Sequence, residues 1–149
     1  MNPPVNSWRI FIHEALETQL AKLAGSVAWM HVAEQTTSKN NRHKKVLKSI
    51  KRAMYESGPA APGRIEHRLG HSIGREHTAW FRVKVLQQFR LFYRYDSAQK
   101  IIVYVWVNDE ESLRAYGSKT DAYALFKKML DSGYPPGTFD ELLEQSREI

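Results

Sequence analysis

The chain contains no cysteine and no long apolar stretch. None of its 149 residues is cysteine, which excludes disulfides and thiolate metal sites. No apolar run approaches the roughly 20 residues that a membrane-spanning helix needs. The N-terminal residues also lack the order of charge, apolar core and small-residue cleavage site that marks a signal peptide. We therefore expect a cytoplasmic protein with no membrane contact.

Acidic residues are absent from one segment of this basic chain. The formal net charge is +6, and no aspartate or glutamate lies between Gln35 and Tyr55. The basic residues of this segment are Lys39, Arg42, Lys44, Lys45, Lys48, Lys51 and Arg52. Such a segment attracts polyanions, but a run of cations is also typical of the solvated face of a helix. Both interpretations stay open. On the first, Lys44, Lys45 and Lys48 are candidates for binding a polyanion.

Hydropathy patterning predicts a single α+β domain made of five segments. Residues 7–13 alternate in the way of a strand, and residues 14–57 have the apolar spacing of two amphipathic helices. Residues 58–78 are rich in glycine, proline and histidine, which predicts a loop. Residues 79–107 predict three antiparallel strands, and residues 108–149 predict C-terminal helices and a tail.

The two N-terminal helices have predicted ends. The apolar stripe of the first helix comprises Leu16, Leu20, Leu23, Val27 and Met30. Its spacings of three and four residues predict a helix that reaches Met30. The second helix is expected to end at the sequence SGPAAPG, because glycine and proline weaken or break helices.

The sequences AWFRVKV and FRLFYRY predict a hairpin whose register can be argued. A three-residue loop at 86–88 sets Val85 opposite Phe89 and keeps the apolar side chains on one face. A two-residue loop would place Arg82 and Lys84 on that buried face, at a high desolvation cost. The next strand, KIIVYVWV, is apolar on both faces and is therefore expected at the centre of the sheet.

The polar face of this hairpin is predicted to be basic, with aromatic rings between the charges. Its residues are Arg82, Lys84, Arg90 and Arg94, with Trp80 and Phe92 among them. Clustered cations suit a phosphodiester and the extra charge of its transition state, and exposed rings can stack unpaired bases. The alternative is a solvent-facing side that is basic for no functional reason. Like charges on neighbouring strands repel, which favours the functional interpretation.

The stretch NDEESLRAYGSKTDAY follows the third strand of the meander and holds more polar side chains than helix ends require. Asn108 and Thr120 can cap two short helices. Capping requires none of Arg114, Tyr116 and Lys119, so these three are candidates for a functional site.

Three histidines raise the question of a metal site. His67, His71 and His77 lie close together in the sequence. No cysteine and no His-x-x-x-His helix accompanies them, so the pattern of a structural or catalytic zinc site is missing. We expect neither a metal nor another cofactor.

The C-terminal half resembles a known family. The sequences FRVK, FRLFYRY, WVNDEESLRAYGSKTDAYALFKKML and SGYPP are similar to the YhaV toxins of PrlF–YhaV toxin–antitoxin pairs, densely over residues 80–136. The resemblance implies a RelE/ParE-like α+β fold. In that fold two N-terminal helices pack on a twisted antiparallel sheet of about four strands, and further helices follow.

The resemblance also implies an activity. It implies an mRNA endoribonuclease that works with the ribosome and without metal, in which the ribose 2′-hydroxyl attacks its own phosphate. A PrlF-like antitoxin of the AbrB type would hold it inactive, and a toxin–antitoxin hetero-oligomer would bind its operator DNA through the antitoxin. The expected catalytic residues are Arg82, Lys84, Arg90, Arg114, Tyr116 and Lys119. The expected substrate-binding residues are Trp80, Phe92, Arg94, Lys44, Lys45 and Lys48.

Two other functional classes stay open. A ParE-like protein would poison DNA gyrase through protein contacts and cut no RNA. A binding module would hold RNA on the same basic face without chemistry.

Overall fold

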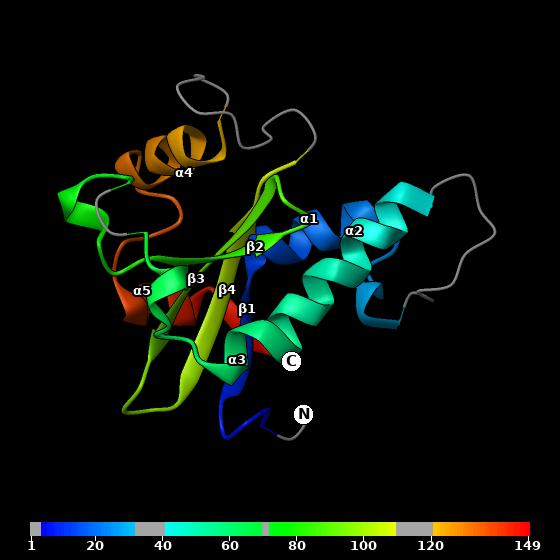
Figure 1. The fold of residues 1–149 in the computed structure, drawn as a ribbon, viewed down its shortest axis with the longest axis horizontal. Coiled ribbons are helices and arrows are strands. Elements are labelled where there is room, and N and C mark those ends of the chain that lie inside the picture. Colours follow the sequence, from blue (N-terminus) through cyan, green and yellow to red (C-terminus); the bar gives the residue numbers. More distant parts are fainter. Residues whose placement is uncertain (1–3, 32–40, 70–71, 110–120) are drawn as a thin grey trace.

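The computed structural model describes residues 4–31, 41–69, 72–109 and 121–149. A central sheet is covered by α1 and α2 on one face and by α4 and α5 on the other (Figure 1). Among the helices of these ranges, none is long and apolar enough to cross a membrane. The predicted α+β class is confirmed.

The sheet has five strands in the order β2-β3-β4-β1-β5. Their bounds are β1 Arg9–His13, β2 Phe81–Val85, β3 Phe89–Asp96, β4 Ile101–Val107 and β5 Ser146–Glu148. The sheet is mixed, since β1 pairs with β4 in parallel. The expectation of an antiparallel sheet of about four strands is therefore wrong. Strand β4, buried on both faces, needs a neighbour on each side, and β1 provides the second one.

Strand β5 was not anticipated because nothing in its three residues predicts a strand. The sequence SRE is short and polar, with no alternation of hydrophobicity. It pairs antiparallel with β1, which has β4 on its other side. An edge strand exposes backbone donors and acceptors, so the returning C-terminus completes hydrogen bonds that only the tertiary structure makes available.

The first helix is shorter than its apolar stripe predicted. Helix α1 spans Glu14–Ala24 and ends at Gly25, whose φ of 70° is in the left-handed region. Val27, expected on the buried stripe, is 90% exposed. Trp29, in the short 3₁₀ turn that follows, is fully buried in its place.

The second helix is longer than predicted. Helix α2 (Asn41–Arg52) continues through a π-helical turn η2 (Ala53–Ser57) into the short α3 (Gly58–Ala60). The helix ends inside SGPAAPG, as predicted, but at Ala60 instead of the predicted residue 57. A Cβ at Gly58 would overlap the Tyr104 hydroxyl, so the glycine permits close packing against the sheet instead of ending the helix.

The predicted hairpin register is confirmed. Val85 pairs with Phe89, and the loop has three residues. Leu86 and Gln87 adopt positive φ angles of 46° and 67°, so this turn forms without glycine. Side-chain Oδ1 of Asn108 accepts from the backbone N–H of Arg90 at 2.6 Å, which helps to hold the loop against the end of β4.

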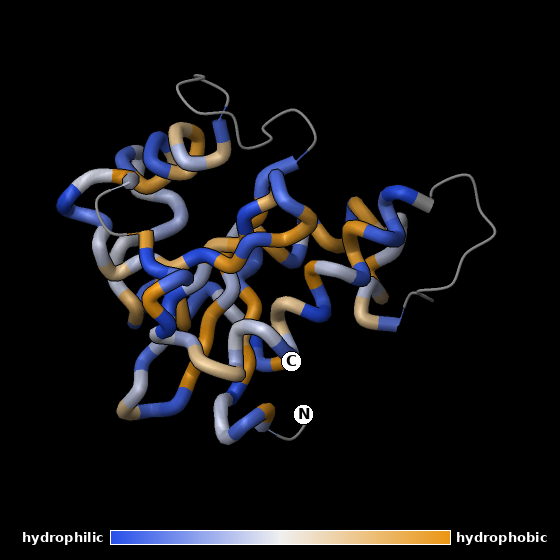
Figure 2. Tube along the Cα trace, in the orientation of Figure 1, coloured by the Kyte–Doolittle hydropathy of each residue, from blue (hydrophilic) through white to orange (hydrophobic). Residues whose placement is uncertain are grey.

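Two hydrophobic clusters lie on the two faces of the sheet. The first joins β-strand side chains to α1 and α2, and the second joins the opposite strand face to α4 (Ala122–Asp131) and α5 (Phe139–Glu144). Hydrophobic residues run along the central strands, whereas α1 and α2 alternate between hydrophobic and hydrophilic positions (Figure 2). Both faces of the sheet are therefore covered, which decides how much of the basic face is accessible.

Candidate functional site

Helix α4 covers much of the basic face predicted on β2 and β3. Trp80 is 2% exposed and Phe92 is fully buried. Both rings pack against Phe126 of α4, at centroid distances of 5.0 and 4.1 Å. The expectation that Trp80 and Phe92 offer exposed stacking platforms is wrong. The apolar side of α4 needed a partner, and these rings provide it.

Of the four cations on this face, only Lys84 is exposed, and Arg90 and Arg94 each donate to backbone carbonyl groups. Arg90 is 5% exposed, and its guanidinium donates to the carbonyl oxygens of Gln87 and Phe89. Arg94 is half-buried and donates to the carbonyl oxygen of Gly137. Burial lowers the pKa of Arg94. The expectation of a solvent-facing basic face is therefore wrong for Arg90 and Arg94.

The hydroxyl of Tyr123 connects Arg82 to Arg90. Nε of Arg82 lies 2.8 Å from Tyr123 Oη, and Nε of Arg90 lies 3.3 Å from it. Asp121 is the N-cap of α4, where its carboxylate accepts from the Tyr123 N–H at 3.0 Å. The cap was expected at Thr120, which lies outside the described residues. The start of α4 thus positions a hydroxyl between two guanidinium groups.

A pocket of about 410 Å³ opens at the outer edge of β2, beyond an isolated backbone bridge between Arg68 and Phe81. We call it the edge pocket; its lining residues are Ser57, Ala60, Arg64, Glu66, His67, Val83 and Lys84. Val83 and Lys84 are successive strand residues whose side chains point to opposite faces. Both can line one pocket only because β2 is an edge strand, so the pocket spans that edge.

The edge pocket carries more positive than negative charge. Arg64 and Lys84 are exposed, and neither side chain has an acidic partner among the described residues. Arg82 reaches the same edge, where Nη1 donates to the carbonyl oxygen of Glu66. The carboxylate of Glu66 is the single acid in the lining. Uncompensated cations beside an open pocket favour binding of an anion.

His67 lies in this pocket, at the end of the 3₁₀ turn η3 (Ile65–His67). Its Nδ1 lies 3.0 Å from the hydroxyl of Tyr93 on β3. The sequence pattern raised this histidine only as a possible metal ligand. No local pattern marks it, because its partner is 26 positions away in the chain.

The remaining predicted residues are not in the edge pocket. Lys44, Lys45 and Lys48 lie on α2, whose apolar side packs on the opposite sheet face from Arg82. Lys45 is exposed, and the other two are half-buried. The structure thus separates these lysines from the cations of β2. His71, Arg114, Tyr116 and Lys119, like Lys39 of the basic segment, lie outside the described residues.

One cluster of side chains has the composition of a metal site. Ligand atoms of Glu76, His77 and Asp131 lie within 4.8 Å of one another. Nζ of Lys127 lies 2.6 Å from Asp131 Oδ2, and His77 Nε2 lies 2.9 Å from Asp131 Oδ1. A lysine ammonium therefore already occupies the cationic position in this cluster, and ion pairing explains its geometry.

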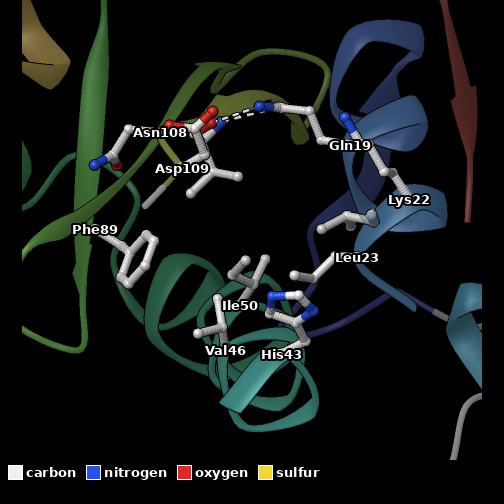
Figure 3. Close-up of a pocket in the computed structure, with 11 residues that line it drawn as sticks. Gln19, Lys22, Leu23, His43, Val46, Ile50, Phe89, Asn108 and Asp109 are labelled. Carbon is white, nitrogen blue, oxygen red and sulfur yellow. Dashed lines mark hydrogen bonds between the residues drawn. The ribbon is translucent and has the colours of Figure 1, made fainter. Parts of the chain in front are cut away.

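A second cavity, of about 400 Å³, lies between α1, α2 and the ends of β3 and β4 (Figure 3). We call it the apolar cavity. Its walls are Leu20, Leu23, Val46, Ile50, Phe89 and Val107, and its rim is Gln19, Lys22, His43, Asn108 and Asp109. Gln19 exchanges two hydrogen bonds with the backbone of Val107, which joins α1 to the end of β4.

Comparison with known proteins identifies a family. Residues 10–147 match the model of a family described as a toxin with endonuclease activity, of a toxin–antitoxin system. Toxin YhaV of Escherichia coli O6:H1 is 32% identical over 146 residues, which cover 97% of this chain and 95% of that protein.

A second relative has a more specific name. Ribonuclease toxin YhaV of Escherichia coli K12 is 32% identical over 146 residues, with the same coverage of both chains. No solved structure matches significantly. Since the family model and the curated relatives each span nearly the whole chain, this protein belongs to the YhaV family of toxins with endonuclease activity, of toxin–antitoxin systems.

Proposed function

We propose that this toxin is a metal-independent endoribonuclease that cuts mRNA at the edge pocket. Its membership of a family of endonucleases, and the ribonuclease name of its relative, favour this function over a gyrase poison or a non-catalytic RNA-binding module. The observation that carries the proposal is the set of cations at the outer edge of β2. Arg64, Arg82 and Lys84 meet there beside a single acid.

The proposed reaction is transesterification at phosphorus. The ribose 2′-oxygen attacks the adjacent phosphorus, the bond from phosphorus to the 5′-oxygen breaks, and the products are a 2′,3′-cyclic phosphate and a 5′-hydroxyl. Arg82 and Lys84 hold the phosphate and stabilise the negative charge that grows on its oxygens. Preorganised donors suit this role, and Arg82 is held in place by the Tyr123 hydroxyl and the Glu66 carbonyl.

Other expected residues have supporting roles in this proposal. Buried Arg90 also donates to the Tyr123 hydroxyl and so helps to fix the group that holds Arg82. Arg114 or Tyr116 is proposed to position the leaving 5′-oxygen, and Lys119 is proposed to support substrate binding. On α2, Lys45 is proposed to bind RNA outside the pocket.

The proposed biological setting follows from the family. An antitoxin partner is implied by a toxin–antitoxin system. We propose that it is PrlF-like and that the toxin acts with the ribosome in the cytoplasm to stop translation. We also propose that the fold is a RelE/ParE-like arrangement in which β1 and β5 extend the antiparallel strands into a mixed sheet.

The test is cleavage of a labelled mRNA by the purified chain, with ribosomes and without them. The expected products carry a 2′,3′-cyclic phosphate, and an RNA with a single 2′-deoxy sugar at the cut position should not be cleaved there. Products with a 5′-phosphate, or cleavage at the deoxy position, would show that the 2′-hydroxyl is not the nucleophile and would refute the mechanism.

A further inference from the structure

The hydrogen bonds of Tyr93 determine which nitrogen of His67 carries the proton. The Tyr93 hydroxyl donates its one proton to the carbonyl oxygen of Pro62, at 2.6 Å. Burial raises the pKa of Tyr93, so this hydroxyl stays protonated. It can therefore only accept from His67, and Nδ1 of His67 must be the donor. In the neutral ring Nε2 is then the proton acceptor.

The surroundings of His67 favour this neutral ring. Partial burial lowers the pKa of His67, and the charges of Arg64 and Arg82 lower it further, while Glu66 acts weakly in the opposite direction. A histidine whose pKa is lowered is mostly neutral at pH 7, and a neutral imidazole can accept a proton. The same two arginines that attract a phosphate thus favour the neutral, proton-accepting form of the histidine.

Two other buried or half-buried histidines have their nitrogens in structural bonds. Nδ1 of His13 accepts from the Ala15 N–H at the start of α1, and its Nε2 bonds Gln145 at 2.7 Å. Nε2 of His77 bonds Asp131. Among the described residues, Nε2 of His67 has no such partner. Of these three, His67 alone combines an acceptor nitrogen with an open cationic pocket.

We propose that His67 is the general base of the edge pocket and that Tyr93 is its positioning residue. Nε2 takes the proton from the ribose 2′-hydroxyl as the 2′-oxygen bonds to phosphorus. The bond to the 5′-oxygen breaks, that oxygen takes a proton from solvent, and the imidazolium returns its proton to solvent. This inference rests on the proposed ribonuclease function, and it gives His67 the role that a permanently charged arginine cannot fill.

The first experiment compares two histidine variants in single-turnover cleavage of labelled mRNA with ribosomes. His67→Asn keeps an N–H for Tyr93 and removes the base, so cleavage should slow about 100-fold or more while RNA affinity changes less than about twofold. His77→Gln, which alters a half-buried histidine outside the pocket, should cleave at the wild-type rate. Equal rates for His67→Asn and wild type would overturn the proposal.

The pH dependence of the wild-type cleavage rate gives a second measurement, which does not depend on whether a variant folds. A base acts only when deprotonated, so the rate should be flat near neutral pH and fall about tenfold per pH unit below the pKa of His67. That midpoint should lie below the ordinary value of about 6.5, because burial and the two arginines lower the pKa. A midpoint above 6.5, or a rate that never falls with acid while the chain stays folded, would overturn the assignment.

Two further variants test the environment of the base. Arg64→Gln removes a nearby charge, so the midpoint of the pH profile should move to higher pH. Tyr93→Phe removes the acceptor that holds Nδ1–H and should slow cleavage about tenfold, with fold retained by circular dichroism. An unmoved midpoint in Arg64→Gln would contradict the role of His67.

RNA cleavage by the wild-type chain distinguishes a failure of the His67 assignment from a failure of the proposed function. If wild type releases cyclic-phosphate ends and His67→Asn does so equally fast, the ribonuclease function stands and the His67 assignment fails. If wild type does not cut RNA at all, both fail together.

Discussion

The two cavities have similar volumes and opposite chemistry. The edge pocket measures about 410 Å³ and the apolar cavity about 400 Å³. Leu20, Val46 and Ile50 line the apolar cavity, whereas Arg64 and Lys84 line the edge pocket. Apolar walls contribute to stability through burial, but cations without acidic partners contribute little to it and repel each other. Volume alone therefore does not identify the candidate site; the charges and the neutral histidine do.

The largest effect we expect is on stability, from the wall of the apolar cavity. Ile50 is 1% exposed, so Ile50→Ala should lower the free energy of unfolding by about 3 kcal/mol. Cleavage per folded molecule should not change, since Ile50 lines the apolar cavity and not the edge pocket. Urea unfolding and active-site-normalised cleavage measure the two quantities. If fully folded Ile50→Ala molecules cleave RNA more slowly than wild type, the two cavities are coupled.

The next largest effect should come from Arg82, whose replacement should lower activity strongly and stability only slightly, the reverse of Ile50→Ala. Arg82→Gln should slow RNA cleavage about 100-fold, or about 2.7 kcal/mol in the barrier, because a preorganised donor to the phosphate is lost. The free energy of unfolding should fall by only about 1 kcal/mol, since the lost hydrogen bonds are partly exposed. Arg75→Gln, an exposed arginine outside the pocket, is the matched control. Wild-type cleavage by Arg82→Gln would remove the edge pocket from the mechanism.

A smaller effect is expected from α2, which lies on the opposite side of the sheet from α4. Lys45 is exposed, so Lys45→Glu should weaken RNA or ribosome association several-fold and reduce its salt dependence. Charge reversal at exposed Lys128 of α4 serves as the control, because it changes net charge equally. If both variants bind alike, the lysines of α2 are a solvated helix face, as one interpretation of the sequence held.

The smallest effect is expected from a chelator. The cluster of Glu76, His77 and Asp131 is already bridged by Lys127, and the proposed mechanism uses arginine and lysine for charge stabilisation. EDTA should therefore leave cleavage within about twofold of its untreated rate, with ribosome integrity checked by sedimentation. Loss of activity that added Mg²⁺ or Zn²⁺ restores would place a metal in the reaction.

Much of the fold could be predicted from local patterns. Alternation in β2 and β3 defined the hairpin register, since a shift by one residue would have buried Arg82 and Lys84. The continuous apolar character of β4 predicted its central place. Gly58 was misread because the same residue type can end a helix or permit a close contact, and only the position of Tyr104 distinguishes the two.

The candidate site was predicted only in part, and the physical reason is that contacts between distant residues have no local period. The sequence by itself determined that Arg82 and Lys84 lie on the polar side of β2, because strand geometry alternates. Only the tertiary structure decided that α4 buries Trp80 and Phe92, since an amphipathic helix can cover whichever face the chain returns to. It also decided that His67 meets Tyr93, whose hydroxyl selects the tautomer that leaves Nε2 as a base.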